Sequence, residues 1–312
     1  MYIGIDLGGT NIAAAVVDKD GAIIKRTKMP TAADRGARTV IEGLLSVCET
    51  LVEEGTAPLS IGIGVPGSVN DENGEVVFTP NLPLSGVNIA GALQKKFGCP
   101  VHLGNDANCA ALGEAIAGGA KGAQDVVFIT LGTGIGGGIV IGGQLYTGIN
   151  GAAGELGHMV TVPGGRACGC GRKGCWERYA SASGIIRTAN EFMEKYSDSL
   201  LWELCGGAAD KVNGHLIFDA YRTGDQAARL TVEQYIEHLA TGIINIINIL
   251  EPELFCIGGG ISNEWDSFAM PLQMAVDAEK YTRSSAQSPQ TRIVKAVLGN
   301  DAGIIGAAML GR

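Results

Sequence analysis

Clusters of basic residues, long apolar runs and cysteine pairs of the C-x-x-C type are absent from this 312-residue sequence. Lys and Arg number 23 against 32 Asp and Glu, and they form no basic patch of the kind typical of nucleic-acid-binding proteins. The most apolar stretch, residues 243–250, is far shorter than the roughly 20 residues that span a membrane. We therefore expect no nucleic-acid partner and no membrane insertion.

The sequence opens directly on a strand-like segment, from which we expect no leader of the secretory type. We expect a cytoplasmic protein, in which a tight group of cysteines indicates a metal site rather than disulfides. The isolated cysteines lie in apolar or helical surroundings and are expected in the core: Cys48, Cys99, Cys109, Cys205 and Cys256.

Glycine is present in excess, with 48 residues, about twice the ~7% of average usage. Most glycines follow apolar runs in short clusters, which favours loops where the backbone closely approaches a ligand. The chain is long enough for two domains with a small-molecule site in a cleft between them.

The expected fold class is α/β. The N-terminal segment predicts strands at 2–6, 11–18 and 22–28, and residues 126–146 repeat its order of strand, Gly-Thr loop and strand. This repeat indicates an internal duplication that gives two similar lobes. Further strands are predicted at 60–65, 101–103, 254–257 and 292–296, and helices at 38–54, 89–97, 106–117, 183–196, 218–221, 225–250 and 302–310. We expect one lobe over 1–117 and the other over 118–299, with a final helix in 300–312 that returns to the first.

Two glycine-rich loops occupy matching places in the repeat. They contain Asp6, Gly8, Gly9 and Thr10 in the first copy, and Gly132, Thr133 and Gly134 in the second. Their amides can face phosphates, and Asp6 can hold a hydrated Mg²⁺. An ordinary glycine hairpin explains either loop alone, but the second copy favours a pair of phosphate loops. Neither loop fits the P-loop or the dinucleotide pattern.

Asn105 and Asp106 follow a short strand and open a helix. Asn and Asp are among the best N-caps, so capping alone could explain the pair. The functional hypothesis is that Asp106 accepts the proton of an attacking sugar hydroxyl in phosphoryl transfer, while Asn105 orients a neighbouring hydroxyl.

One imidazole and three thiols stand close together in the sequence, as His158, Cys168, Cys170 and Cys175. A Cys₃His set suits a closed, tetrahedral, structural Zn²⁺. A disulfide or redox pair is the alternative, but it would leave one thiol unpaired. The same turn would bring Glu155 and Glu177 near the metal, where two fixed acceptors suit a polyol; ordinary surface carboxylates are the alternative.

These motifs in this order resemble the ROK family (repressors, open reading frames and kinases), and above all its bacterial glucokinases. The resemblance spans essentially the whole chain. It rests on Asp6–Thr10, Gly64–Gly67, Asn105-Asp106, Leu131–Gly138, Glu155–His158, Cys168–Glu177 and Gly258–Gly260.

The resemblance implies an actin-like fold of two RNase-H-like lobes, and an ATP-dependent hexose kinase with glucose as the first candidate. Asp106 would be the general base, and Mg²⁺ would accompany ATP. The implied sugar contacts are Asn105, Asp106, Glu155, His158, Glu177 and Gly67. The nucleoside would meet Gly258, Gly259 and Gly260, and His158 would serve both zinc and sugar. Homodimers are common in the family, so a homodimer is expected.

Several alternatives stay open at this point. Many family glucokinases carry an aromatic residue where Leu84, Ser85 and Gly86 stand here, which leaves N-acetylmannosamine, N-acetylglucosamine, fructose or allose as possible substrates. The family also contains sugar-responsive repressors, whose DNA-binding segment precedes the kinase-like fold. A sugar-binding pseudokinase is a further alternative.

Overall fold

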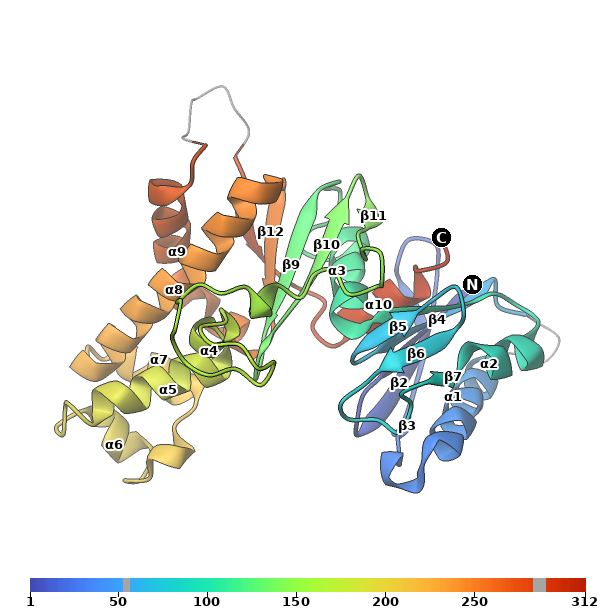
Figure 1. Cartoon of the computed structure of the whole chain (residues 1–312), viewed down its shortest axis with the longest axis horizontal. Helices are drawn as coiled ribbons and strands as arrows, with labels where there is room; N and C mark the ends of the chain where they lie inside the picture. The colour runs from blue at the N-terminus through green and yellow to red at the C-terminus, as the bar shows by residue number, and fades with distance from the viewer. Residues whose placement is uncertain (53–56, 283–289) are drawn as a thin grey trace. The chain divides into compact units, whose positions relative to one another are not determined.

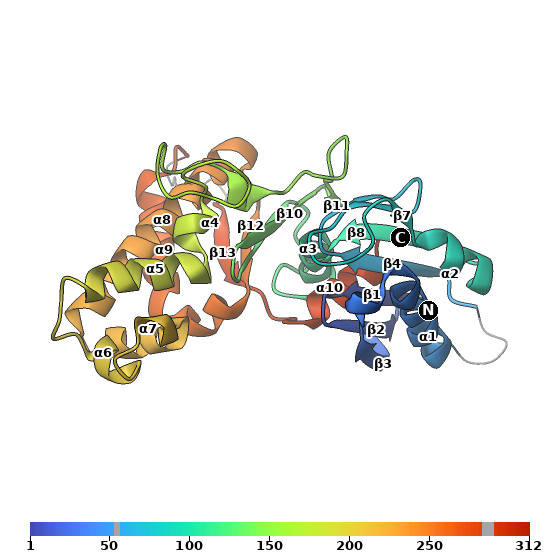
Figure 2. The same cartoon turned by 60° about the horizontal axis from the view of Figure 1, so that its bottom comes forward.

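Two five-stranded sheets with the same strand order form the framework of the computed structural model, which describes residues 1–52, 57–282 and 290–312. The first sheet has the order β3-β2-β1-β4-β8, and the labels in Figure 2 follow this order. Its strands are β1 (Tyr2–Leu7), β2 (Asn11–Val17), β3 (Ile23–Pro30), β4 (Ser60–Val65) and β8 (Val101–Asn105). β1 pairs antiparallel with β2 and parallel with β4, and β4 pairs parallel with β8.

The second sheet repeats this order as β11-β10-β9-β12-β13. Its strands are β9 (Val126–Leu131), β10 (Ile135–Ile141), β11 (Gln144–Leu145), β12 (Leu254–Gly258) and β13 (Arg292–Lys295). Here too a short antiparallel pair, β10 with β11, lies at one edge, and a parallel pair, β12 with β13, lies at the other. The shared topology confirms the internal duplication that the repeated glycine loops predict.

A small antiparallel sheet of β5 (Ser68–Asn70), β6 (Glu75–Phe78) and β7 (Val87–Asn88) was not predicted. Its strands have two to four residues, which is too short for an alternating pattern to be recognised.

The chain divides into two compact units. The first comprises Met1–Phe128, Gly137–Gly154 and Ala296–Arg312, and the second comprises Ile129–Gly136 and Glu155–Lys295. Helices of the first unit are α1 (Ala37–Leu51), α2 (Ala90–Phe97), α3 (Asp106–Ala117) and α10 (Asp301–Ala308). The predicted helix at 38–54 is thus confirmed as far as residue 51, while its residues 53 and 54 lie outside the described part of the chain.

In the first unit, α10 packs closely against α3, β1 and β4. Small residues make this approach possible: a Cβ added at Gly113 of α3 would lie 2.2 Å from the carbonyl oxygen of Ala302. Glu114 of α3 is fully buried, and it accepts hydrogen bonds from the amides of Gly119, Val297 and Leu298. These contacts fix α3, whose first residue is Asp106, against its sheet.

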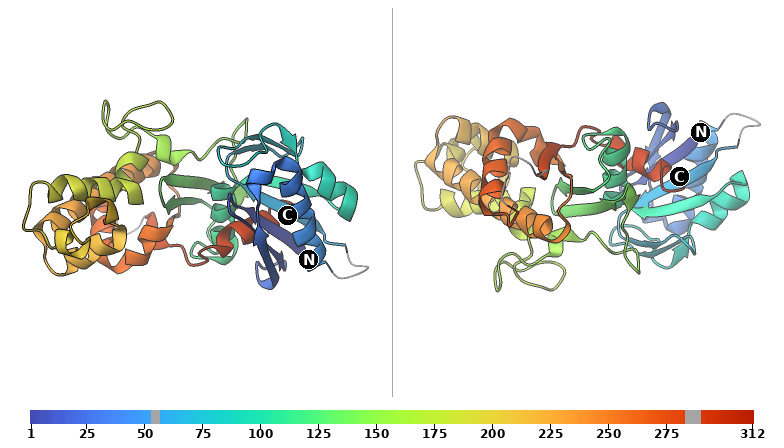
Figure 3. Two further views of the ribbon diagram at one scale, coloured as in Figure 1. Left: turned by 90° about the horizontal axis from the view of Figure 1, so that it is seen from below. Right: turned by 90° about the horizontal axis from the view of Figure 1, so that it is seen from above.

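The second unit contains α4 (Glu177–Ala180), α5 (Ala182–Met193), α6 (Leu200–Leu204), α7 (Gly214–Arg222), α8 (Gln226–Leu250) and α9 (Trp265–Glu279). α8 packs against α5, α7 and α9, and these yellow to orange helices form one bundle in both views of Figure 3. In Figure 1, β12 lies beside α8 and α9.

Four helices of the second unit differ from the sequence prediction: α4, α6 and α9 were not predicted, and α7 begins earlier than expected. α9 was missed, because Pro271 interrupts a pattern that would otherwise indicate a helix. α7 begins four residues before the predicted start at 218, with the Asn213 side chain accepting a hydrogen bond from the amide of Leu216 as its N-cap. Over the described ranges, the structure contains no helix with the length and apolar content of a membrane span.

Candidate active site

Asp106 is the first residue of α3, directly after the carboxyl end of β8, and it is exposed. Asn105 is the N-cap of this helix, since its Oδ1 accepts hydrogen bonds from the amides of Ala107 at 2.9 Å and Asn108 at 3.1 Å. Its Nδ2 donates to the carbonyl oxygen of Gly67 at 3.0 Å. Asn105 is therefore the N-cap, and Asp106 Oδ1 also accepts a hydrogen bond from the Ala107 amide at 2.9 Å, with its carboxylate at the surface of the first unit.

Gly67 follows β4 in a backbone conformation with φ of +129°. A Cβ at this position would lie 2.1 Å from the carbonyl oxygen of Phe78, so no larger residue fits. Because the Gly67 carbonyl is also the partner of Asn105, this close approach fixes the loop after β4 beside the start of α3.

Asp6 lies near the carboxyl end of β1, opposite Gly64 of the neighbouring parallel strand β4. Burial, and to a smaller extent the charge of Asp106, raises the pKa of Asp6 to about 6. Two carboxylates of one unit thus interact electrostatically, which is an arrangement that a hydrated divalent cation stabilises.

The first glycine loop joins β1 to β2 and leaves Gly9 and Thr10 exposed. The Gly8 amide donates to the carbonyl oxygen of Asn11 at 2.9 Å, and the Gly8 carbonyl accepts from the Thr31 hydroxyl at 2.6 Å. The base of the loop is therefore fixed while the backbone at its tip is accessible to a ligand.

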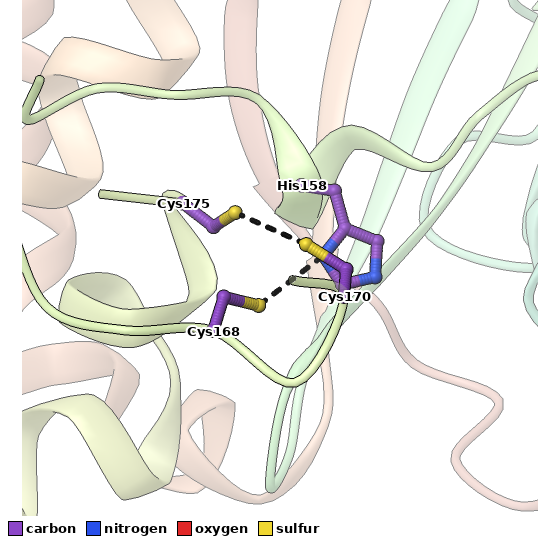
Figure 4. Close-up of side chains that lie close together, drawn as sticks. All are labelled: His158, Cys168, Cys170 and Cys175. Atoms are coloured by element: carbon purple, nitrogen blue, oxygen red, sulfur yellow. Dashed lines mark hydrogen bonds between the residues drawn. The ribbon is translucent and has the colours of Figure 1, made fainter. Parts of the chain in front are cut away.

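In the second unit, the ligand atoms of His158, Cys168, Cys170 and Cys175 all lie within 4.8 Å of one another. Figure 4 shows the three sulfur atoms and the imidazole converging on one point. His158 Nδ1 is 3.6 Å from Cys168 Sγ, and the Sγ atoms of Cys170 and Cys175 are 3.6 Å apart. Tetrahedral coordination with Zn–S of about 2.3 Å and Zn–N of about 2.0 Å has edges of roughly 3.5–3.8 Å.

The same spacing excludes a disulfide at this place, because a sulfur–sulfur bond is about 2.05 Å long. All three cysteines of the cluster are free thiols, as are the five isolated cysteines, which are buried as predicted. The donor set and its spacing therefore fit a tetrahedral metal ion.

The two carboxylates near this cluster have different surroundings. Glu177 is half-buried; its Oε1 accepts a hydrogen bond from Cys168 Sγ at 3.0 Å and lies 3.8 Å from His158 Nδ1. Glu155 is exposed, and its Oε2 lies 3.9 Å from His158 Nε2. The imidazole thus presents Nδ1 to the cysteines and Nε2 to Glu155.

The second glycine loop, residues 132–134, lies against this cluster. A Cβ at Gly134 would fall 2.5 Å from Glu177 Oε2, and the Gly132 carbonyl accepts a hydrogen bond from the Ala182 amide at 2.8 Å. Thr133 between them is exposed. Glu177 therefore occupies the space between the cysteine cluster and the loop.

The loop 258–260 after β12 also reaches the second glycine loop. A Cβ at Gly259, where φ is +86°, would lie 2.4 Å from the backbone nitrogen of Leu131, the residue before Gly132. A Cβ at Gly260 would meet no atom within 4 Å, so this side of the loop is open. The proposed nucleoside and phosphate loops are thus in direct backbone contact within the second unit.

Sequence reasoning assigned no role to Trp176, although it stands between Cys175 and Glu177. Its side chain is fully buried, and its Nε1 donates to the His238 carbonyl at 2.8 Å. A Cβ at Gly242 of α8 would lie 2.0 Å from the indole ring. Trp176 therefore anchors the cysteine segment to α8. The sequence feature that could have indicated this role is a large aromatic residue directly beside a candidate metal ligand.

In the segment Leu84 to Gly86, where many family glucokinases carry an aromatic residue, only the first residue is buried. Leu84 is fully buried, and the Ser85 hydroxyl accepts a hydrogen bond from the Thr79 amide at 3.1 Å. Gly86 has φ of +75°, which L side chains rarely adopt.

The chain is similar to known sugar kinases along almost its whole length. The chain is 40% identical to the glucokinase of Thermotoga maritima over 311 residues, which covers 99% of this chain and 96% of that protein. It is 35% identical to the N-acetyl-D-glucosamine kinase of Salmonella typhimurium, with 99% of each chain covered.

Among solved structures, a ROK family glucokinase from Streptomyces griseus in complex with glucose and AMPPNP superposes with a TM-score of 0.78. Its sequence identity is 35%, and the match covers 99% of this chain and 98% of that one. Such ROK sugar kinases have the actin-like ATPase fold, which confirms the fold predicted for this chain. The ROK family itself matches residues 2–312, and the chain therefore belongs to the ROK family.

Proposed function

We propose that this protein is an ATP-dependent glucokinase, which converts glucose and ATP to glucose 6-phosphate and ADP. The observation that carries the proposal is the exposed Asp106 at the start of α3, in the same unit as the half-buried Asp6, whose pKa is raised by desolvation and by the charge of Asp106. The relatives named glucokinase, matched along almost their full length, support glucose as the substrate.

In the proposed reaction, the carboxylate of Asp106 accepts the proton of the sugar's 6-hydroxyl as that oxygen attacks the γ-phosphorus. The new O–P bond forms as the bond to the bridging oxygen of ADP breaks, and ADP leaves with the electron pair. Asn105 holds α3 and the Gly67 loop together, and its second Nδ2 hydrogen is the group that would orient a neighbouring hydroxyl. Catalysis of this kind depends mainly on positioning and charge.

The backbone of the two glycine loops would bind the phosphates, and Asp6 would accept hydrogen bonds from the water shell of Mg²⁺. Bound Mg²⁺ would neutralise charge on the β- and γ-phosphates. The open side of Gly258–Gly260 would receive the nucleoside, because the loop already touches the second phosphate loop through Leu131.

Zn²⁺ is the ion that we propose for the Cys₃His cluster, where it would be structural because no coordination position is left open. His158 would bind it through Nδ1 and leave Nε2, beside Glu155, for a sugar hydroxyl. Glu177 would supply a further acceptor.

A second candidate substrate is N-acetylglucosamine, since a kinase named for it is 35% identical along the whole chain. N-acetylmannosamine, fructose and allose remain further candidates from the sequence. The repressor and pseudokinase alternatives are disfavoured by the presence of Asp6, Thr10 and Asp106 with an intact second loop. A homodimer and a cytoplasmic location stay predictions.

The role of Asp106 is tested by Asp106→Asn. The amide cannot accept the proton, so kcat should fall by about 10²–10⁴-fold while the far-UV spectrum and Tm are retained. Asp266→Asn is a matched control, since Asp266 is likewise an exposed acid in the first turn of a helix, α9. Unchanged kcat in Asp106→Asn would remove Asp106 from the mechanism.

A further inference from the structure

The 3₁₀ helix η4 (Gly260–Glu264) continues directly from the proposed nucleoside loop. Ser262 ties it back to that loop, because its amide at 3.0 Å and its hydroxyl at 2.7 Å both donate to the Gly259 carbonyl. The backbone of Gly259 in turn packs closely against the backbone of Leu131. Gly260, the open position of the loop, is thus the first residue of a short, tightly bonded segment.

The other end of this segment is Glu264, whose carboxylate is only 13% exposed. Its Oε2 accepts a hydrogen bond from Arg222 Nη1 at 2.7 Å, and its Oε1 lies 3.2 Å from His215 Nδ1. Both partners belong to α7, and Arg222 Nη1 also donates to the Ser267 hydroxyl at 3.0 Å. Glu264 therefore joins η4 to α7 through both of its oxygens.

In this network the carboxylate is shielded from solvent, while the side chains of Arg222 and His215 are 44% and 71% exposed. Exposed pairs contribute little, because solvent screens them and both side chains lose conformational freedom. A half-buried carboxylate with two partners from one helix holds its geometry better, because each charge-assisted hydrogen bond restricts the other. His215 Nε2 also lies 3.3 Å from Asp219 Oδ2, and Arg222 pairs with Asp219 as well. Asp219 of α7 therefore helps to hold both partners of Glu264 in place.

We propose that Glu264 is a positioning residue for the nucleotide, which holds Gly260 and the nucleoside loop in the binding conformation by fixing η4 to α7. This inference rests on the proposed function, because it assumes that Gly258–Gly260 receives the nucleoside of ATP. Glu264 acts through the loop and makes no contact with the sugar or the transferred phosphate.

The test compares Glu264→Gln with wild type in steady-state kinetics, with ATP and glucose varied separately. KM for ATP should rise about fivefold to tenfold, the loss expected for one charge-assisted contact, while KM for glucose changes by less than about twofold. Glu233→Gln is the control, because Glu233 pairs with Arg229 on the solvent-facing side of α8 at a similar distance of 2.8 Å. Its KM for ATP should match wild type.

Arg222→Gln and the double variant separate positioning from simple charge. If Glu264 acts by anchoring η4, Arg222→Gln raises KM for ATP too, and the double variant is no worse than Glu264→Gln alone. A simple charge effect predicts the reverse, since loss of an anion near ATP would lower KM. An unchanged or lowered KM for ATP in Glu264→Gln, or an equal rise in KM for glucose, would overturn the proposal.

If Glu264→Gln fails to fold, the milder variant Arg222→Lys takes its place in the test. Lys retains the positive charge but lacks the several N–H donors of the guanidinium group, so it should raise KM for ATP less than Arg222→Gln. Equal KM values for wild type and Arg222→Lys would in that case contradict the inference. Failure of the proposed function gives a different result: wild-type protein with MgATP then phosphorylates no sugar at all.

Discussion

Among single residues, Asp6 combines burial with the nearby charge of Asp106, and both raise the pKa of its carboxyl group to about 6. An unfolded chain would have a pKa near 3.9 for this group. Between these values the folded protein binds the proton more tightly, so its stability falls as pH rises from about 4 to about 6. Above pH 6 the ionised Asp6 carboxylate destabilises the folded state by the full amount, at most about 3 kcal/mol.

Asp6→Asn should therefore raise the free energy of unfolding at pH 7, by at most about 3 kcal/mol, in buffer without divalent cations. The gain should shrink as pH falls and vanish near pH 4, while kinase activity is lost because the Mg²⁺ contact is removed. Urea unfolding of both proteins at pH 4, 5, 6 and 7 measures this. Equal stability at all four values would show that Asp6 has an ordinary pKa.

The sequence alone could place Asp6, Asn105 and Asp106 at strand ends, because each follows an apolar run. It could not show which of Asn105 and Asp106 is the N-cap of the helix and which is the candidate general base, since both residue types cap helices well. Both side chains accept a hydrogen bond from the Ala107 amide, and the further bond from the Asn108 amide to Asn105 Oδ1 identifies Asn105 as the cap.

At the scale of elements, the segment from His158 to Glu177 has little regular structure of its own. It contains one short 3₁₀ helix, two isolated bridges and the start of α4, and it depends on Trp176 for its attachment to α8. A segment of this kind needs a further constraint to hold its side chains in place, and a metal ion in the Cys₃His cluster would provide it.

Removal of that ion should lower both Tm and the affinity for sugar, because His158 and Glu177 lose their fixed positions. The measurement is metal content by mass spectrometry, then Tm and glucose binding before and after treatment with a chelator. Cys175→Ser should reproduce the effect, whereas Cys205→Ser, at an isolated buried cysteine, should leave metal content unchanged. Pure protein with no stoichiometric zinc would contradict the zinc assignment.

Other elements show where sequence patterns fail. The hairpin of β2 and β3 was predictable because an Asp-Gly turn separates two apolar runs. α9 was hidden by Pro271, and β5 to β7 were too short to show a period. The closeness of Gly134 and Glu177 could not be predicted either, since it depends on how the cysteine segment folds back on β9 and β10.

For the whole molecule, the strand order is duplicated as the repeated loops predict, and the similarity to glucokinases along almost the whole chain places it among ATP-dependent sugar kinases. The choice of sugar depends on a few contacts around the hydroxyl groups. A site that hydrogen-bonds a hydroxyl discriminates strongly against analogues that lack it. N-acetylglucosamine differs from glucose at one position of the ring, where an acetamido group replaces the 2-hydroxyl.

The most direct test of the account is therefore kcat/KM for a panel of sugars with MgATP: glucose, mannose, fructose, allose, N-acetylglucosamine and N-acetylmannosamine. Glucose should give the highest value, with phosphate on the 6-oxygen of the product and one ADP formed per sugar phosphorylated. ADP formation that requires no sugar, or a higher kcat/KM for an acetamido sugar than for glucose, would contradict the proposal that this protein is a glucokinase.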